Sequence, residues 1–259
     1  MAGLYEKQAE IYAQARPKYP REWFSKLASL TAHHKRAWDA GTGSGQAAVN
    51  VAEHYEKVIA TDVSEAQIKH AIPHPKVQYI HTPLSTSEQD FVSMLGGEGS
   101  VDLVTVATAV HWFDLPSFYA IVNRVLRKPG GVIAVWGYNY DIHPLEDVMK
   151  RFYVSTLPYM DERPGYAFER YRSLPFPFES IGLGTEGSPA SFDMDLEVSF
   201  DGFVESLRTG SAVATAKERG VDLLTEEVVK ELRTAWGGSD IRKITYKAFM
   251  LAGTPKLEG

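Results

Sequence analysis

Short apolar runs alternate with amphipathic stretches over the first two thirds of the chain, and this alternation restricts the possible folds more than any other feature. The runs are rich in valine and isoleucine and carry few charges, which is typical of strands buried on both faces of a parallel sheet. The stretches between them have helical spacing. Strand and helix in alternation predict an α/β fold with a doubly wound, mostly parallel sheet. The predicted strands are residues 36–41, 57–62, 77–82, 101–107 and 131–138.

The remainder of the chain follows a different pattern. Residues 139–190 are rich in Pro, Tyr, Phe and Arg, and we interpret them as an inserted cap over the open edge of the sheet. Residues 191–200 alternate apolar and polar side chains, which predicts an antiparallel strand paired with a last strand at 242–251. The sheet would then have seven strands, the last one antiparallel. Helices are predicted at about 201–209, 211–219 and 225–236.

Composition excludes several classes of function. The chain has 259 residues and no cysteine, so disulfides, thiolate metal sites and cysteine nucleophiles are excluded, and no metal-site pattern is present. The net charge of −6 argues against a nucleic-acid partner. No apolar run reaches the roughly 18 residues of a membrane span, and the first residues are polar. We expect a cytoplasmic protein, monomeric or homodimeric, with no membrane partner.

The segment "AWDAGTGSGQAA" (37–48) carries three glycines directly after the first predicted strand. A strand, a Gly-x-Gly-x-Gly turn and a helix form a loop whose backbone a cofactor can approach. In dinucleotide-binding folds the spacing is Gly-x-Gly-x-x-Gly, but here Gln46 stands at the position of the third glycine. Asp39 precedes the loop, where a carboxylate would repel a pyrophosphate and favour a cationic group.

Asp62 ends the second predicted strand and can accept two hydrogen bonds from a ribose diol. A site for a ribose without a pyrophosphate, beside a carboxylate that favours a cation, describes S-adenosylmethionine. The same residues allow simpler interpretations. The glycines could form only a tight turn, Asp39 could only anchor the loop, and Asp62 could only complement a helix dipole.

At these positions the sequence resembles a known family. "DAGTGSGQAA" and "TDVS" are similar to the first two motifs of class I S-adenosylmethionine-dependent methyltransferases, which have a Rossmann-like fold. The blocks "YAQARPKYP" (12–20), "TAVHWFD" (108–114), "VLRKPGGVIAVWGY" (125–138) and "LRTGSAVATAKERGVDLLT" (207–225) resemble a small-molecule branch related to trans-aconitate methyltransferases, which includes many plant proteins.

The resemblance implies an organisation and a set of site residues. Residues 1–35 would form a helical lid, 36–138 the cofactor-binding core, 139–190 the cap and 191–259 the remainder of the catalytic domain. The strand ends would hold the cofactor, with the methionine part along the glycine loop and the ribose at the second strand. The implied cofactor-binding residues are Tyr12, Arg16, Asp39, Ala40, Gly41, Thr42, Gly43, Asp62, Val63, Thr82 and Thr108.

Two departures from the family leave questions open. Many class I enzymes carry an acid after the third strand that binds the adenine amino group, whereas this chain reads "IHTPLST", so His81, Thr82 or backbone would have to substitute. Relatives often have Ser-Trp before the serine in "LRTGSAV", where this chain has Thr209-Gly210. A missing indole would enlarge the pocket if that position faces it.

His111 is the candidate catalytic residue, because it stands at the carboxyl end of a central strand. It could orient the acceptor, act as a base, or simply pack and fix the loop. The predicted walls of the acceptor pocket are Trp112, Trp136, Tyr138 and Gly210, although Trp112 and Phe113 could be ordinary core. Arg163, Arg170 and Arg172 could clamp an acidic substrate or form a solvated surface.

Methyl transfer is an in-line displacement, so the enzyme mainly aligns donor and acceptor. A carboxylate is ionised at neutral pH and needs no base, which fits a sequence without a compact catalytic dyad. The leading hypothesis is therefore O-methylation of a small carboxylic acid. The alternatives are N- or phenol O-methylation, a nicotinamide-dependent oxidoreductase, and a non-catalytic protein that binds S-adenosylmethionine; a macromolecular acceptor is a further option.

Overall fold

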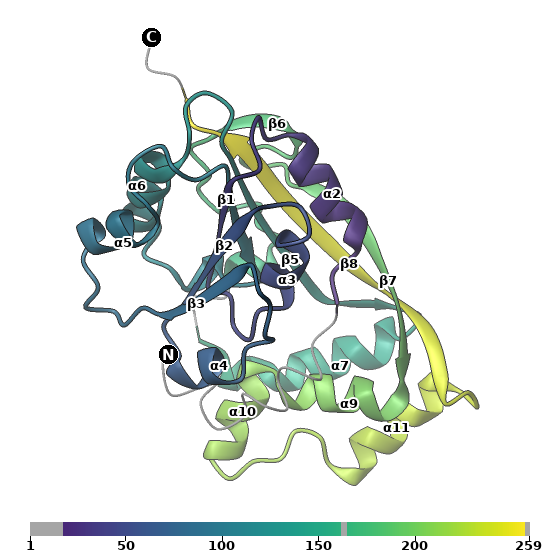
Figure 1. Ribbon diagram of the computed structural model, residues 1–259. Coiled ribbons are helices and arrows are strands. Elements are labelled where there is room, and N and C mark those ends of the chain that lie inside the picture. Colours follow the sequence, from purple (N-terminus) through teal and green to yellow (C-terminus); the bar gives the residue numbers. More distant parts are fainter. Residues whose placement is uncertain (1–17, 162–164, 257–259) are drawn as a thin grey trace.

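The computed structural model describes residues 18–161 and 165–256. One sheet forms the centre of the molecule, and its strands follow the order β3-β2-β1-β4-β5-β8-β6, with β7 also paired to β8 (Figure 1). The first five of these strands in the order are parallel, and β8 runs antiparallel to β5. The strands are β1 (Arg36–Ala40), β2 (Lys57–Asp62), β3 (Val77–His81), β4 (Leu103–Ala107), β5 (Val132–His143), β6 (Glu179–Leu183), β7 (Ala190–Ser199) and β8 (Ile241–Thr254).

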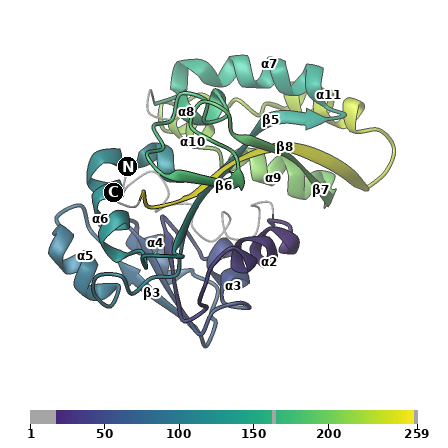
Figure 2. The same cartoon turned by 90° about the horizontal axis from the view of Figure 1, so that it is seen from above.

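Helices cover both faces of the parallel part of the sheet. In Figure 2, α2 and α3 lie on one side of the strands, and α5 and α6 lie on the other. These helices, with their neighbours, are α2 (Arg21–Ser29), α3 (Gln46–Val51), α4 (Glu65–Lys69), α5 (Glu88–Met94), the short η1 (Val110–Trp112) and α6 (Leu115–Val125). The fold class is the predicted one, a doubly wound α/β sheet with antiparallel strands at its end.

A second group of helices gathers beyond the carboxyl end of β5, where the chain passes directly into α7. Figure 1 shows α7, α9, α10 and α11 together at the lower end of the molecule. The helices of this part are α7 (Glu146–Thr156), η2 (Leu157–Tyr159), α8 (Gly165–Phe168), α9 (Phe200–Arg208), α10 (Ser211–Glu218) and α11 (Glu226–Trp236). The three predicted C-terminal helices agree with α9, α10 and α11 to within a residue.

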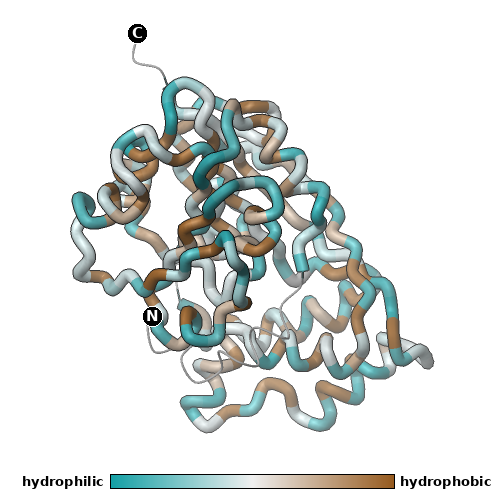
Figure 3. Tube along the Cα trace, in the orientation of Figure 1, coloured by the Kyte–Doolittle hydropathy of each residue, from teal (hydrophilic) through white to brown (hydrophobic). Residues whose placement is uncertain are grey.

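Alternation along β5 explains why the strand is apolar throughout. Val132, Ala134 and Trp136 belong to the core on the α2 and α3 side of the sheet. Ile133 and Val135 belong to the core under α5 and α6. A strand with helices on both faces buries both sets of side chains, so its sequence reads as a continuous apolar run. Figure 3 shows these hydrophobic segments in the interior and hydrophilic ones on the connecting loops.

The cap prediction needs correction in two respects. β5 does not end at residue 138 but continues to His143, with an irregularity in its pairing to β8 between Tyr138 and Ile142. The segment 139–190 also supplies a strand, β6, so the sheet formed by the described residues has eight strands instead of the seven expected. The predicted boundary at 138/139 therefore falls inside a strand, and part of the inserted segment extends the sheet.

The remaining strand predictions are confirmed. β7 and β8 pair antiparallel from Ala190–Met250 to Ser199–Ile241, as the alternating patterns of the two segments indicated. Within the described parts of the chain, none of the helices combines the length and the apolar character that crossing a bilayer requires.

Candidate cofactor and acceptor site

The loop between β1 and α3 has a backbone that only glycine adopts readily. Gly41, Gly43 and Gly45 have φ angles of +64°, +58° and +91°, in the left-handed region. The amide of Thr42 donates to the carbonyl of Thr61 at 3.0 Å, which fastens the loop to the end of β2. The three alternating glycines therefore specify one tight turn at the carboxyl edge of the sheet.

Two of these glycines are also required by the protein's own side chains. A Cβ at Gly41 would lie 2.7 Å from the Cβ of Ala109 and 3.0 Å from the Phe113 ring. A Cβ at Gly45 would lie 2.8 Å from Cζ of Tyr79. The interpretation of these glycines as a bare surface for a ligand is thus incomplete, because packing inside the protein requires Gly41 and Gly45 on its own.

Asp39 connects the loop to the neighbouring strand from a position that is only 1% exposed. Its carboxylate accepts hydrogen bonds of 2.6 Å from the hydroxyls of Thr42 and Thr105. Burial raises the pKa of Asp39 to about 6. The hydrogen bonds from the two hydroxyls oppose this rise, and the negative charge of Asp62 adds to it. Asp39 is therefore a buried acid that holds Thr42 in the loop and Thr105 in β4.

Asp62 joins the loop to the next strand. Its carboxylate accepts from the backbone N–H groups of Gly43 and Ser64, each at 2.8 Å. Burial raises the pKa of Asp62, although these backbone donors oppose the shift. The backbone N–H of Val63 also acts on this carboxylate, but a carboxylate accepts about four hydrogen bonds, so Asp62 can still accept from a ligand hydroxyl.

The residues expected near an adenine base lie at the ends of β2 and β3. Thr82 is 7% exposed, and both its amide (2.8 Å) and its hydroxyl (3.3 Å) donate to the carbonyl of Asp62. Nε2 of His81 lies 3.1 Å from the carbonyl oxygen of Val63. The Thr82 hydroxyl is therefore engaged within the protein, whereas His81 is exposed. Ala40, at the end of β1, is part of the buried core.

Thr108 holds a strained position at the carboxyl end of β4. Its φ is +54°, which costs energy for a residue with a Cβ and is frequent at functional sites. Its amide donates to the carbonyl of Trp136 at 2.8 Å, and its hydroxyl lies 3.2 Å from the hydroxyl of Tyr19. Tyr19 was not among the predicted site residues, although it lies in the quoted block 12–20.

His111 lies on η1, just beyond the end of β4. Its ring contacts that of Trp112, with 5.3 Å between centroids, and its Nδ1 lies 3.4 Å from the hydroxyl of Tyr171. Burial lowers the pKa of His111 to about 4, so the imidazole is neutral at pH 7. Tyr171 is a second residue that the sequence analysis missed, because 60 residues separate it from His111.

The predicted pocket walls have different neighbours. Trp136 is 1% exposed and packs against Tyr19, with 5.5 Å between centroids, so it is part of the core. Tyr138 packs edge-on against Tyr246 at 5.2 Å. Gly210 caps α10 and donates its N–H to the carbonyl of Leu207 at 3.0 Å. Tyr12, Arg16 and Arg163 lie outside the described residues.

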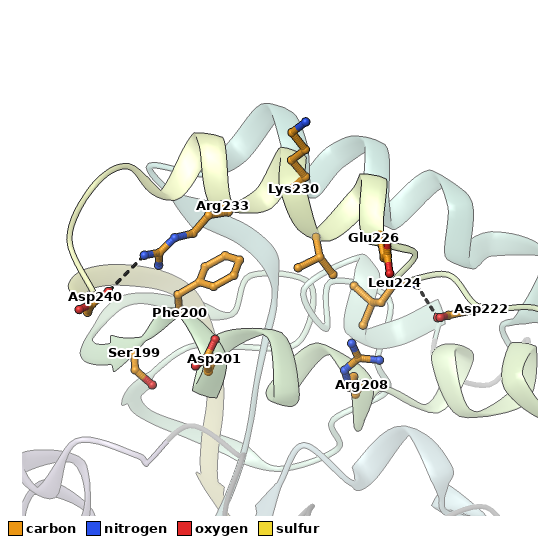
Figure 4. A pocket seen from close by; sticks show the side chains of 11 residues that line it. Ser199, Phe200, Asp201, Arg208, Asp222, Leu224, Glu226, Lys230, Arg233 and Asp240 are labelled. Atoms are coloured by element: carbon orange, nitrogen blue, oxygen red, sulfur yellow. Dashed lines mark hydrogen bonds and ion pairs between the residues drawn. The ribbon is translucent and has the colours of Figure 1, made fainter.

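Among the pockets lined by described residues, two contain none of the predicted cofactor or acceptor residues except Arg170. The larger has a volume of about 710 Å³ and lies between α9 and α11, with Arg233 stacked on Phe200 and paired with Asp240 at 3.1 Å (Figure 4). The smaller, about 310 Å³, lies beside α7 and α8, and the pair Asp141–Arg170 (2.6 Å) lines it. Within the described residues, no cluster of three or more His, Asp or Glu side chains could hold a metal ion.

Together these features define a class of protein. The sheet is doubly wound, a glycine loop with left-handed backbone follows its first strand, and acids end the first and second strands. These features converge at the carboxyl edge of the sheet, where open α/β sheets bind their ligands. The remaining acceptor capacity of Asp62 suits a ribose hydroxyl, and Gln46 replaces the third glycine of a pyrophosphate loop. The class is that of nucleoside-cofactor enzymes with a Rossmann-like fold.

Comparison with known proteins narrows the class to one family. Residues 38–135 match the family model described as a methyltransferase domain. A protein of Dictyostelium discoideum that is named a methyltransferase is 30% identical over 255 residues, 94% of this chain and 91% of its own length. A Saccharomyces cerevisiae protein named as an S-adenosylmethionine-dependent methyltransferase is 29% identical over 135 residues, 49% of this chain and 44% of its own length.

A solved structure from Anaeromyxobacter dehalogenans, described as a type II methyltransferase, has a TM-score of 0.76 and 34% identity, and the match covers 93% of this chain and 99% of that one. The chain belongs to the S-adenosylmethionine-dependent methyltransferases, and its cofactor is S-adenosylmethionine. The oxidoreductase and the non-catalytic alternatives find no support in these matches.

Proposed function

We propose that this methyltransferase acts on a small molecule and methylates a carboxylate oxygen. The observation that carries the proposal is the environment of His111, the imidazole at the carboxyl end of β4. Its pKa of about 4 makes it a weak base at neutral pH. A carboxylate acceptor has lost its proton already and requires no base, whereas phenol and amine acceptors must lose a proton.

S-adenosylmethionine supplies a methyl group on a positively charged sulfur. The protein has to bind the methyl donor and the acceptor, orient them and enclose them. In the proposed site, Asp62 accepts from a ribose hydroxyl, while Val63 and Thr82 lie beside the adenine. Gly41, Gly43 and the backbone of Ala40, Thr42 and Thr108 follow the methionine part. Asp39 holds this loop through Thr42 and contributes negative charge beneath the cationic end.

The acceptor would lie beside His111 and Trp112, with Tyr138 and Gly210 as the more distant walls, while Trp136 stays buried in the core. We propose that Tyr12 and Arg16 belong to an N-terminal lid and that 139–190 contributes a cap. Both would exclude water, which strengthens electrostatic contacts during transfer. The resemblance of four blocks to the trans-aconitate branch and the net charge of −6 support a small acceptor over a nucleic acid.

An acceptor screen with the intact protein and labelled S-adenosylmethionine tests the proposal. Small carboxylic acids, phenols and amines are offered separately, and the labelled product is treated with mild base. A methyl ester releases labelled methanol, whereas an ether or a methylated amine retains the label. We expect base-labile product from the acids only. Base-stable product from phenols or amines alone would overturn the carboxylate assignment and would make His111 a candidate proton acceptor.

A further inference from the structure

Two consecutive residues of the cap hold an unusual backbone. Arg170 and Tyr171 have φ angles of +54° and +59°, although neither is glycine. The amide of Tyr171 donates to the carbonyl of Tyr166 at 2.7 Å, and the guanidinium of Arg170 pairs with Asp141 at 2.6 Å. Left-handed residues with a Cβ are strained and persist where their surroundings hold them.

This backbone directs the side chain of Tyr171 into the core toward the predicted acceptor site. Tyr171 is 0% exposed and packs edge-on against Phe249, with 4.8 Å between centroids. Its hydroxyl lies 3.4 Å from Nδ1 of His111 and 3.4 Å from the carbonyl oxygen of Trp136. A tyrosine hydroxyl has one proton, so it can donate fully to only one of these two acceptors.

The needs of the two acceptors differ. The carbonyl of Trp136 already accepts the N–H of Thr108 at 2.8 Å. An unprotonated Nδ1 of the buried His111 needs a donor, because an unsatisfied buried acceptor is costly. Another arrangement also satisfies these groups: Nδ1–H donates to the hydroxyl oxygen and the hydroxyl donates to the Trp136 carbonyl, which leaves Nε2 without a proton. An Nε2 without a proton has nothing to donate to a carboxylate. The proposed acceptor therefore favours the first arrangement, in which Tyr171 donates to Nδ1 and the ring proton is on Nε2. Such contacts are often long in the absence of ligand and tighten when it binds.

We propose that Tyr171 is a positioning residue that donates to Nδ1 of His111 and so fixes the tautomer with its proton on Nε2. The Nε2–H group then donates to one oxygen of the acceptor carboxylate while the other oxygen attacks the methyl group; the O–C bond forms as the C–S bond breaks, and the electron pair stays on the sulfur of the departing S-adenosylhomocysteine. This inference rests on the proposed carboxylate acceptor. It also explains selectivity for a carboxylate over an amine. An attacking amine carries N–H groups of its own, and these would face the Nε2–H of His111, which cannot accept a hydrogen bond.

The chain offers a matched control for the variant Tyr171→Phe. Tyr119 is also buried in the same core cluster, and its hydroxyl donates to the carbonyl of Pro175 at 2.8 Å. Tyr119→Phe removes a buried tyrosine hydroxyl without touching His111. Both variants keep the ring, so their packing is preserved.

The first test measures the tautomer directly, by nitrogen NMR of the full chain labelled at histidine, with His111→Gln used to assign the signal. We expect the Nε2–H form of His111 in the wild type and in Tyr119→Phe, and a mixture of tautomers in Tyr171→Phe. The Nδ1–H form in the wild type, or an unchanged tautomer in Tyr171→Phe, would overturn the proposal. This measurement needs no acceptor, so it remains decisive if the acceptor is not a carboxylic acid.

The second test uses the carboxylic acid accepted in the screen. Tyr171→Phe should lower kcat about tenfold, the effect expected for losing one oriented hydrogen bond, with the KM for S-adenosylmethionine unchanged. His111→Gln with Tyr171→Phe should be no slower than His111→Gln alone, because Tyr171 acts through His111. Independent, multiplicative losses in the double variant would contradict that coupling. Failure of every acid with success of an amine would overturn the acceptor assignment but not the tautomer result.

Discussion

At the scale of single residues, Gly45 illustrates how a cofactor motif is also a packing motif. Its φ is +91°, and a Cβ there would overlap the Tyr79 ring, whose hydroxyl is held by the carbonyl of Ile72 at 2.7 Å. Gly45→Ala should lower the free energy of unfolding by about 2–3 kcal/mol, since backbone strain and a clash add. Denaturant unfolding measures this loss.

Gly97 provides the control for this prediction. Its φ is +97°, nearly the same as that of Gly45, but a Cβ there meets no atom within 4 Å. Gly97→Ala should therefore cost only the backbone strain, about 1 kcal/mol. Equal losses for the two variants would show that the Tyr79 ring yields freely and that packing does not require a glycine at position 45.

Asp39 gives a prediction about pH. Its pKa is raised from 3.8 to about 6, so the folded state binds this proton more tightly than the unfolded state. The contribution of Asp39 to stability is thus fully present below pH 3.8 and is lost as the pH rises through about 6. Asp39→Asn should therefore stabilise the ligand-free protein at pH 7, by roughly 1–3 kcal/mol, and much less at pH 4.

Thermal unfolding of both proteins across this pH range measures the difference. The same variant should bind S-adenosylhomocysteine more weakly, because it lacks the negative charge under the loop. A stability gain independent of pH would contradict the assignment of the raised pKa to Asp39.

The sequence supports some residue assignments and not others. The positions of Asp39, Asp62 and the glycines follow from spacing at the strand ends, which is local information. Tyr19 and Tyr171 reach Thr108 and His111 across 89 and 60 residues, and only the folded chain brings them together. Nothing local distinguishes Tyr171 from the other tyrosines of the cap.

At the scale of elements, the two ends of the parallel strands have different tasks. Asp62 lies at the carboxyl edge and joins two loops, whereas Asp102 lies at the amino edge. Asp102 accepts from the amides of Lys35 (2.8 Å) and Arg36 (3.0 Å) and from Nε of Arg127 (2.6 Å). Burial alone would raise the pKa of Asp102, but these donors outweigh burial and lower the pKa. The ionised Asp102 therefore stabilises the fold, and this contribution is lost as the pH falls through the lowered pKa.

Asp102→Ala should therefore destabilise the fold by about 3 kcal/mol, because it leaves a partly buried guanidinium and two amides unpaired. The affinity of the folded variant for S-adenosylhomocysteine should equal that of the wild type. Asp62→Ala should show the converse, with an affinity at least about tenfold weaker from the loss of one charged hydrogen-bond acceptor. Titration at a temperature where both variants are folded compares them. Weaker binding by Asp102→Ala alone would contradict the placement of the site at the carboxyl edge.

The two strand segments that the sequence failed to predict share a cause. β6 is only five residues long, contains Gly182 and has no fully buried residue, so its strand character depends on pairing with β8. The extension of β5 to His143 likewise depends on β8, where Ile142 pairs with Tyr246 after the irregularity. Strands that form because a distant partner offers an edge leave little trace in their own composition. The parallel strands were predictable because each one is buried on both faces.

At the scale of the whole molecule, the match to the Dictyostelium and Anaeromyxobacter proteins covers more than nine tenths of each chain. The resemblance therefore includes the antiparallel strands and the helices beyond the carboxyl edge, not only the core with the glycine loop. Because the match covers nearly the whole of these chains, it assigns this chain to the methyltransferases. We propose that the acceptor is recognised between η1 and the segment 139–190, where Nδ1 of His111 lies 3.4 Å from the hydroxyl of Tyr171.

The most direct test of the central claim is a calorimetric titration of the wild-type protein with S-adenosylhomocysteine, with NAD as the control. The left-handed glycine loop and the remaining acceptor capacity of Asp62 predict binding of S-adenosylhomocysteine at one site per chain and no heat from NAD. A folded protein that binds NAD, or that binds neither compound, would contradict the assignment of this site to a methyl-donor cofactor.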